Sequence, residues 1–343
     1  MMPTDVSTRP RETPEAEAAH PQKKFRRAAL QTLLHYGGSA LVLILLFRFL
    51  PGRQVWGALG ELPARLWIAV LAAYLGAHCI GIAKWRLMVN VAGTGLSVPQ
   101  AARCYFAGLF GSLFLPSLIG GDLVKAGLAM RLGRSKAGAL LGSLLDRMID
   151  FAGLVVLAGA GALLVPGALD QRGRRIFLLL GAAAAIAAGV IAAALALLPL
   201  GKFPIRIRRR LVPVRRAVRS IARQPRAMLA ALSLAIVAQL VFISLSLALA
   251  EACGLHLQFR VWLFAWPLAK LSAAIPVTQG GIGVREAALA ALLLPFGAPA
   301  ALTVAAGLAW EAIVISGGLV AGIFSLLAAR FFPAASHPPR RAS

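Results

Sequence analysis

Six predominantly apolar stretches, each about 20 residues or longer, limit the possible folds of this chain more than any other feature. A transmembrane helix needs about 20 such residues to cross the hydrocarbon core of a bilayer. The composition agrees, because 59% of the residues are hydrophobic and only 14% are charged, against about 25% charged in soluble domains. The sequence therefore predicts an all-α polytopic membrane protein. The predicted spans are 30–50, 64–83, 137–165, 176–198, 227–250 and 302–328.

Two further apolar segments are shorter and are interrupted by proline and glycine. They are Ala101–Pro116 with the Gly-Gly-Asp that follows, and Val261–Pro276 with the Gln-Gly-Gly that follows. Proline and glycine at membrane depth free backbone polar groups, which are tolerated only inside protein or beside a wet cavity. We interpret both segments as broken or re-entrant helices, which gives about six full spans. The alternative is that both are ordinary short spans, which gives eight.

The charge of the chain is strongly asymmetric, with 36 Lys+Arg against 12 Asp+Glu and a net charge of +24. In the six-span arrangement most basic residues fall on the side that holds both termini and the loop at 199–226. The excess of basic residues assigns that side to the cytoplasm, as in a bacterial-type inner membrane. We expect the basic stretch 202–226 to bind anionic lipids of the inner leaflet. This interpretation explains the charge without nucleic acid.

The same features divide the chain into three parts. Residues 1–29 are polar, contain several prolines and end in a basic run, which is typical of a disordered cytoplasmic tail. Residues 30–330 form the predicted transmembrane domain, whose first stretch acts as an uncleaved anchor. Residues 331–343 form a C-terminal tail. The three cysteines lack a CxxC pair and are expected to be small buried side chains.

The two interrupted segments match each other at one shift, since 276 − 116 = 160. Two prolines, two glycine pairs and two basic residues correspond, namely Pro116, Gly120, Gly121 and Lys125 with Pro276, Gly280, Gly281 and Arg285. The same shift places the second span on the fifth and the third on the sixth. The halves, about 30–165 and 176–328, each hold three crossings and should face opposite ways. Inverted repeats with broken helices are typical of secondary transporters.

Five of the twelve acidic residues lie beside the interrupted segments or inside predicted spans, where an ionisable group usually marks a functional site or a buried pair. In the first half we expect the glycine turn and nearby cations to hold a lipid phosphate, and the acids to meet a cationic headgroup or a proton. The alternatives are a helix cap for Asp122, membrane anchoring for the cations, and a structural pair for Arg147. The candidate headgroup-binding residues are Gly120, Gly121, Asp122, Lys125, Arg131, Asp146, Arg147 and Asp150.

The second half contributes the most distinctive motif of the chain. Its glycines allow a close approach of backbone to a ligand, and Glu311 is expected to pair with Lys270 or Arg285. The candidate headgroup-binding residues here are Gln279, Gly280, Gly281, Gly283, Arg285, Glu286 and Glu311. We predict no catalytic residue, cofactor or metal site, because the GxGxxG spacing of a dinucleotide site, a P-loop and metal-spaced histidines are all missing from the sequence.

These motifs resemble a known family over roughly residues 30–330. The motifs Pro-x-x-x-Gly-Gly-Asp at 116–122, Asp-Arg-x-x-Asp at 146–150 and Pro-x-x-Gln-Gly-Gly-x-Gly-x-Arg-Glu at 276–286 are similar to the flippase-like transmembrane domain of lysylphosphatidylglycerol synthases. Full synthases of that kind carry a soluble aminoacyl-transferase domain after the membrane part, whereas this chain ends at Ser343. The resemblance therefore implies lipid handling or translocation, of a phospholipid, a polyprenyl-linked lipid or a hopanoid-related lipid, and not aminoacylation.

Two functions follow from the sequence as hypotheses. The first is a lipid flippase or transporter that is not an enzyme and whose partners are membrane lipids. The second is a non-catalytic membrane subunit that organises a lipid- or glycan-modifying enzyme, in which case the charged residues form structural pairs. An intramembrane enzyme is the least supported option, because no nucleophile with a base and no metal cluster is visible in the sequence.

Overall fold

The computed structural model describes most of the apolar part of the chain. The described residues are 52–115, 120–165, 205–273, 278 and 281–331, with isolated positions between 171 and 193. Within them the chain forms ten α-helices and one short 3-10 helix, η3 (Leu294–Phe296), and no strand. The all-helical prediction is confirmed. The predicted span 30–50, most of 176–198 and both predicted tails lie outside the described residues.

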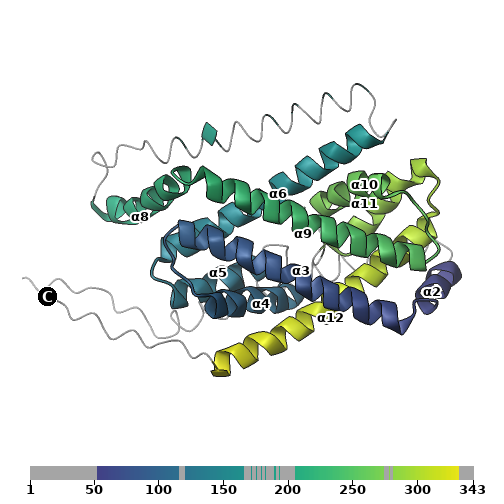
Figure 1. The fold of residues 1–343 in the computed structure, drawn as a ribbon, viewed down its shortest axis with the longest axis horizontal. Coiled ribbons are helices and arrows are strands. Elements are labelled where there is room, and N and C mark those ends of the chain that lie inside the picture. Colours follow the sequence, from purple (N-terminus) through teal and green to yellow (C-terminus); the bar gives the residue numbers. More distant parts are fainter. Residues whose placement is uncertain are drawn as a thin grey trace, which may run out of the picture.

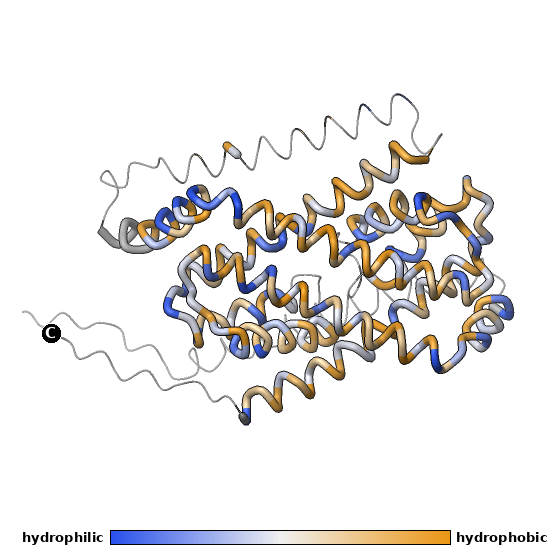
Figure 2. Tube along the Cα trace, viewed as in Figure 1, coloured by the Kyte–Doolittle hydropathy of each residue, from blue (hydrophilic) through white to orange (hydrophobic). Residues whose placement is uncertain are grey.

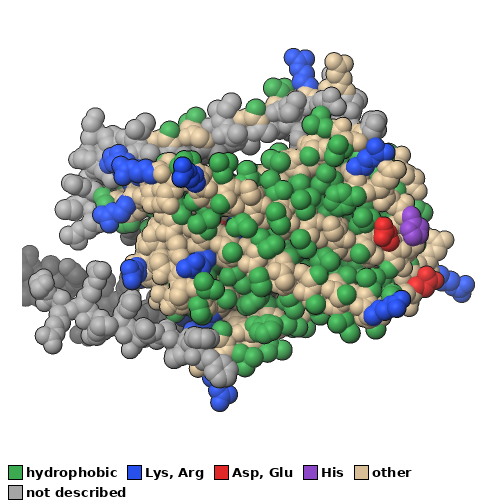
Figure 3. All heavy atoms as spheres, in the orientation of Figure 1, with side chains coloured by type: hydrophobic (Ala, Val, Ile, Leu, Met, Phe, Trp, Pro, Cys, Tyr) green, Lys and Arg blue, Asp and Glu red, His purple; other side chains and the backbone are tan. Residues whose placement is uncertain are grey.

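Four helices are long and apolar enough to cross a bilayer, and each matches a predicted span. They are α3 (Ala64–Val91), α6 (Lys136–Leu164), α9 (Pro225–Ala252) and α12 (Ala300–Phe331). Their middle parts are predominantly hydrophobic, and polar residues gather at the two ends of the molecule (Figure 2). Many large apolar side chains are exposed, such as Ile68 at 67% and Leu163 at 69%. Figure 3 shows how such side chains cover the middle of one face, as expected of a surface that faces lipid.

The described helices form two series with the same order, in which a long helix is followed by two short helices and another long helix (Figure 1). The short helices are α4 (Val98–Phe114) and α5 (Gly120–Leu132) in the first series, and α10 (Phe259–Ser272) and α11 (Val284–Leu293) in the second. The remaining helices are α2 (Gly52–Gly60), which packs on α12, and the basic helix α8 (Ile205–Ala222), which packs on α6.

Glycines allow α4 and α5 to pack side by side in opposite directions. A Cβ atom at Gly121 would lie 3.0 Å from Ser112 Cβ, and one at Gly108 would lie 3.0 Å from Lys125 Cβ. The contact points therefore approach the start of α4 as they approach the end of α5, so the two helices are antiparallel. Small residues at such contacts replace the hydrophobic driving force that is missing between helices in lipid. Ser97 begins α4 with a capping box, because its Oγ accepts from Gln100 N while Gln100 Oε1 accepts from Ser97 N.

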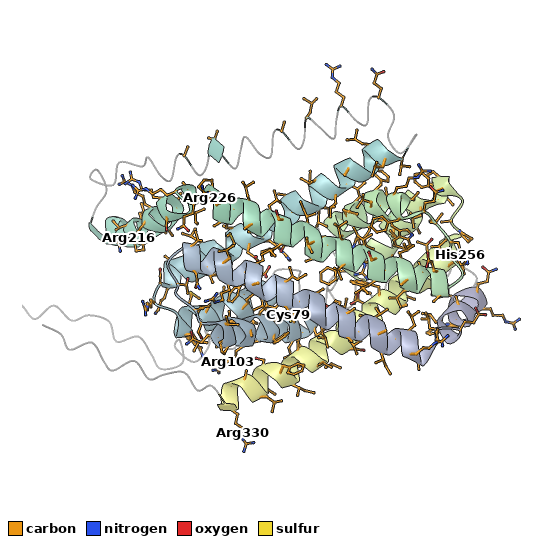
Figure 4. All side chains as sticks on the ribbon, viewed as in Figure 1. Cys79, Arg103, Arg216, Arg226, His256 and Arg330 are labelled. Atoms are coloured by element: carbon orange, nitrogen blue, oxygen red, sulfur yellow. The ribbon has the colours of Figure 1, made fainter. Side chains whose placement is uncertain are left out.

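The two short helix pairs have their free ends at opposite ends of the molecule. Helix α4 starts and α5 ends near α8, whereas α10 starts and α11 ends at the other end (Figure 1). At the end where α8 lies, Ser220 on α8 donates a hydrogen bond to Val91 O at the end of α3, and Ser325 near the end of α12 donates to Arg103 O near the start of α4. At the other end, Gly161 near the end of α6 touches Phe264 on α10. Arg103, Arg216, Arg226 and Arg330 lie at the first end and His256 at the second (Figure 4).

Helix α6 joins the two series through glycine contacts on both of its neighbours. A Cβ at Gly142 would lie 2.5 Å from Val89 Cα on α3, and one at Gly161 would lie 2.4 Å from Phe264 N on α10. Both are backbone atoms, which cannot rotate away as a side chain can. The larger of the core clusters that pack around these helices includes Trp262, Phe264 and Trp310. Of the cysteines, Cys104 and Cys253 are buried and free as expected, but Cys79 is exposed and free.

We predict that Gly161→Ala destabilises the protein because the added methyl group separates α6 from α10. Overpacking of this kind costs about 1–3 kcal/mol. The matched control is Gly76→Ala on α3, where nothing lies within 4 Å of the added Cβ and where alanine favours the helix by about 1 kcal/mol. Thermal unfolding of both variants in detergent would measure the difference. Equal unfolding temperatures would mean that the α6–α10 contact can relax without cost.

Candidate functional site

A network of six charged side chains joins α3, α5 and α6, and we call it the first charged cluster. Its members are Lys84, Asp122, Lys125, Asp146, Arg147 and Asp150. Lys84 Nζ lies 2.8 Å from Asp146 Oδ1 and 2.6 Å from Asp150 Oδ1. Lys125 Nζ lies 3.0 Å from Asp122 Oδ1 and 3.3 Å from Asp146 Oδ2. Arg147 Nε lies 3.3 Å from Asp122 Oδ2. Three bases and three acids leave the cluster without net charge.

Aromatic rings hold the lysine of α5 in this cluster. Lys125 Nζ lies 5.3 Å from the ring centre of Trp85 and 5.1 Å from that of Tyr105, distances at which the face of a ring attracts a cation. Trp85 is itself fixed, because its Nε1 donates a 3.0 Å hydrogen bond to Ser143 Oγ on α6. Helices α3, α4 and α6 thus position a single ammonium group.

The first charged cluster has a closed side and an accessible side. The side chains of Lys84, Lys125 and Asp146 are 8% exposed or less, whereas those of Asp122, Arg147 and Asp150 are 23–26% exposed. The accessible groups are two carboxylates and one guanidinium. A charged ligand would reach these three groups first, whereas the buried groups join the helices.

The second charged cluster joins α11 to α12 and consists of Arg285, Glu286 and Glu311. Arg285 Nη2 lies 2.5 Å from Glu286 Oε1 and 2.9 Å from Glu311 Oε2, and its guanidinium lies 5.8 Å from the ring centre of Trp266. One cation therefore serves two carboxylates. Glu286 is fully buried, whereas the Glu311 side chain is 14% exposed.

The glycines of this region place Glu286 beside the arginine. Gly283 has φ +85°, a left-handed conformation that glycine adopts without strain, and its N–H donates a 2.6 Å hydrogen bond to Glu286 Oε2. Glu286 therefore caps the start of α11. On the facing helix, a Cβ at Gly307 would lie 2.7 Å from Glu286 Cγ. The absence of a side chain at that position gives the glutamate room against α12.

A fifth basic group of the helix interior, Lys270, lies near the end of α10. Its Nζ donates a 3.0 Å hydrogen bond to Gln239 Oε1 and lies 5.1 Å from the ring centre of Phe242, both on α9. The charges that act on it most strongly belong to Asp150, Arg147, Arg285 and Lys84. Lys270 is thus influenced by both charged clusters.

The structure brings most of the predicted site residues into these two clusters. In the first half, Arg131 is the exception, because it is exposed at the end of α5. Gly120 begins α5, with Asp122 in its first turn. In the second half Glu311 pairs with Arg285, which is one of the two expected partners. Gly281, with φ +83°, packs against Ala273. Pro116, Pro276, Gln279 and Gly280 lie outside the described residues.

Sequence reasoning missed Lys84 and Lys270 as site residues. Lys84 directly follows the predicted end of a span at Ala83, and the six-span arrangement places it among the basic residues of the inner side. Helix α3 continues to Val91, so Lys84 is inside it and buried. The available signal was the absence of a helix breaker before Gly93. Lys270 was expected only as a possible partner of Glu311, a pairing that the structure gives to Arg285.

A comparison with known families agrees with this architecture. The family model described as "Lysylphosphatidylglycerol synthase TM region" matches residues 32–322. The chain belongs to this family. The match covers both helix series and both charged clusters, and it makes the protein a membrane protein with a lipid-related domain. A comparison with curated proteins finds no match.

We predict that Lys84→Met strongly lowers the unfolding temperature, because it leaves Asp146 and Asp150 facing each other with one cation fewer. Removing one partner of a buried pair costs about 3–5 kcal/mol. Lys136→Met, at an exposed position at the start of α6, is the control and should unfold like the parent. Adding Asp150→Asn to Lys84→Met should restore part of the stability. Failure to restore it would contradict charge balance as the cause.

Proposed function

We propose that this protein moves a polar-headgroup lipid between the leaflets of the membrane. The observation that carries the proposal is a pair of charged clusters inside an otherwise apolar helical domain. Each cluster lies beside a short helix pair, and the two pairs have their free ends at opposite ends of the molecule. Charged side chains inside membrane helices are costly, and they usually line the path of a substrate or an ion. Membership in a lipid-related transmembrane family supports the same function.

We infer that the two helix series form an inverted repeat. The first long helix of each series has 28 residues, and the starts of these helices differ by 225 − 64 = 161. The starts of α4 and α10 differ by 259 − 98 = 161. Each series also places a base of its second short helix against an acid of its last long helix, namely Lys125 with Asp146 and Arg285 with Glu311. In this proposal α4–α5 and α10–α11 are re-entrant pairs that enter from opposite leaflets.

The mechanism follows from the most exposed residues of each cluster, Asp122, Arg147 and Asp150 in the first and Glu311 in the second. A headgroup that enters from the inner leaflet meets Asp122, Arg147 and Asp150, which replace part of its hydration. Rocking of one series against the other then exposes it to Glu311 and Arg285 on the outer side, as in other transporters built from inverted repeats. The fatty-acid chains remain in the bilayer, where the apolar outer faces of the helices are compatible with them.

Helix α8 supplies the link to the inner leaflet in this proposal. Its sequence alternates isoleucine, leucine and valine with arginines at 206, 208, 209, 210, 215, 216 and 219. Such a helix lies in the membrane interface and attracts anionic lipids. Placing this end in the cytoplasm of a cell with a bacterial-type inner membrane follows from the positive-inside rule.

A reconstitution experiment tests the proposed function. Vesicles with the purified full chain and a fluorescent phospholipid are treated with a membrane-impermeant quencher, and the rate at which inner-leaflet lipid becomes quenchable is measured. The wild type should exceed protein-free vesicles. Glu311→Gln and Asp122→Asn should slow the movement by about tenfold or more, since a charge-assisted hydrogen bond contributes about 1.5–3 kcal/mol.

The matched control is Glu251→Gln, which makes the same change at an exposed position of α9 and should leave the rate unchanged. If wild type and protein-free vesicles give equal rates, the protein does not move that lipid, and a subunit that organises a modifying enzyme becomes the better explanation. If wild type works and both acidic variants match it, the clusters are structural pairs.

Cysteine labelling tests the re-entrant pairs and the orientation. In a Cys79→Ser background, Ser97→Cys and Arg134→Cys flank α4–α5, and Gln258→Cys and Pro299→Cys flank α10–α11. All four flanking positions are exposed, although the Ser97 and Gln258 side chains also form local hydrogen bonds. An impermeant thiol reagent should reach the first two from the cytoplasmic side and the last two from outside. In an eight-span topology the members of each pair would react from opposite sides.

A further inference from the structure

We propose that Lys270 is the anion-binding residue of the transport site and that it binds a phosphate group of the substrate lipid. The proposal rests on the function proposed above and names the chemical class of headgroup that the site takes. It also adds to the site a residue that the sequence offers only as a possible partner of Glu311.

Lys270 differs from the other basic residues of the two clusters in its partners. Each of those four cations has a carboxylate oxygen within 3.3 Å. No carboxylate of the described residues lies within the 4.0 Å of an ion pair from Lys270 Nζ. The acids outside the described residues are four in the N-terminal tail and Asp170. None of these belongs to the segments that join α4 to α5 or α10 to α11.

The groups that do contact Lys270 leave most of its charge uncompensated. Gln239 offers an amide oxygen and Phe242 offers a ring face, and neither carries a formal charge. An ammonium group inside a membrane domain is costly without an anion beside it. A bound anion would supply the missing charge. Lys270 is also partly exposed rather than sealed in the core, so a ligand has access to it.

The charged groups on the elements packed around Lys270 are of both signs. Asp150 on α6 acts on it most strongly, followed by Arg147 on α6, Arg285 on α11 and Lys84 on α3. Those three bases are themselves paired with acids of the two charged clusters, so the Lys270 ammonium is the basic group that an anion would meet without a carboxylate of the described residues beside it. Helix α9 contributes the neutral Gln239 and Phe242 to this contact.

A polar atom without a hydrogen-bond partner among the described residues lies near the same aromatic ring. His78 on α3 is buried, its ring centre is 5.3 Å from that of Phe242, and Lys270 is the charge that acts on it most strongly. Its Nδ1 lies 3.3 Å from the Tyr105 hydroxyl, but its Nε2 has no hydrogen-bond partner among the described residues. A phosphate has several acceptor oxygens, so it can engage a lysine and a second donor together. Lysine is a common point-charge ligand for phosphate.

Binding measurements on the purified full chain in an uncharged maltoside detergent test the proposal. The probes are dioctanoyl phosphatidic acid, dioctanoylglycerol, which lacks the phosphate, and inorganic phosphate, and the readout is the shift in unfolding temperature with concentration. The wild type should be stabilised by phosphatidic acid but not by dioctanoylglycerol. Lys270→Met should raise the apparent Kd for phosphatidic acid by about tenfold or more, which corresponds to about 1.4 kcal/mol.

Two further variants make the result specific. Lys270→Arg keeps the positive charge and should retain most of the affinity, and Lys136→Met removes an exposed lysine and should bind as the wild type does. Lys270→Met leaves no carboxylate without its partner, so it should fold, in contrast to Lys84→Met. If it does not fold, the proposal is judged on Lys270→Arg and on the three probes with wild type.

Three outcomes would overturn the proposal. Unchanged binding by Lys270→Met removes Lys270 from the site. Loss of binding by a folded Lys270→Arg means that a property other than positive charge matters. Equal stabilisation by inorganic phosphate and phosphatidic acid assigns the site to the free ion. If wild type moves lipid in vesicles but Lys270→Met binds phosphatidic acid as wild type does, only this inference is refuted. If Lys270→Met loses binding but wild type moves no lipid, only the proposed function is refuted.

Discussion

The pairing of charges inside an apolar helical domain is the constraint on which the rest of this structure depends. A lone charge in such a domain costs several kcal/mol, and it is tolerated when an opposite charge lies within hydrogen-bonding distance. The first charged cluster satisfies this condition by drawing bases and acids from three different helices. Each pair therefore also specifies which helices are neighbours. Lys84 and Asp146, for example, fix α3 against α6 in a single register.

The glycines make these pairs geometrically possible. Short ion pairs between helices require close backbones, and α3, α4, α5 and α6 approach one another at glycines whose added Cβ would collide with backbone or with a neighbouring side chain. The second cluster uses the same principle at Gly307, which leaves room for Glu286. Close approach therefore has two consequences in this fold. It supplies the packing that replaces the hydrophobic effect in lipid, and it brings side chains from separate helices into contact.

Much of the fold could be predicted from the sequence, because length and apolarity decide where a helix crosses a bilayer. Four predicted spans coincide with α3, α6, α9 and α12, and the two Gly-Gly motifs lie near the starts of the short helices α5 and α11. The partners within the site were harder to predict. The spacing of Asp146 and Asp150 places both on one face of α6, but nothing local reveals that Lys84, more than 60 residues earlier, lies between them. Such pairs depend on tertiary packing, which hydropathy does not encode.

The placement of Lys84 and Lys270 shows how the same residue type acquires different roles in one domain. The sequence places Lys84 just after a predicted span and offers Lys270 only as a possible partner of Glu311, yet Lys84 lies inside α3 and Lys270 bonds to α9. Lys84 meets two carboxylates and stabilises the contact between α3 and α6. Lys270 meets an amide and a ring, and no carboxylate of the described residues lies within ion-pair distance of it. The basic groups of the two clusters all contact carboxylates, and a cation without one is useful if a transported anion completes the pairing during part of each cycle. The cost of that cation in the empty protein then becomes a source of affinity and selectivity for the ligand.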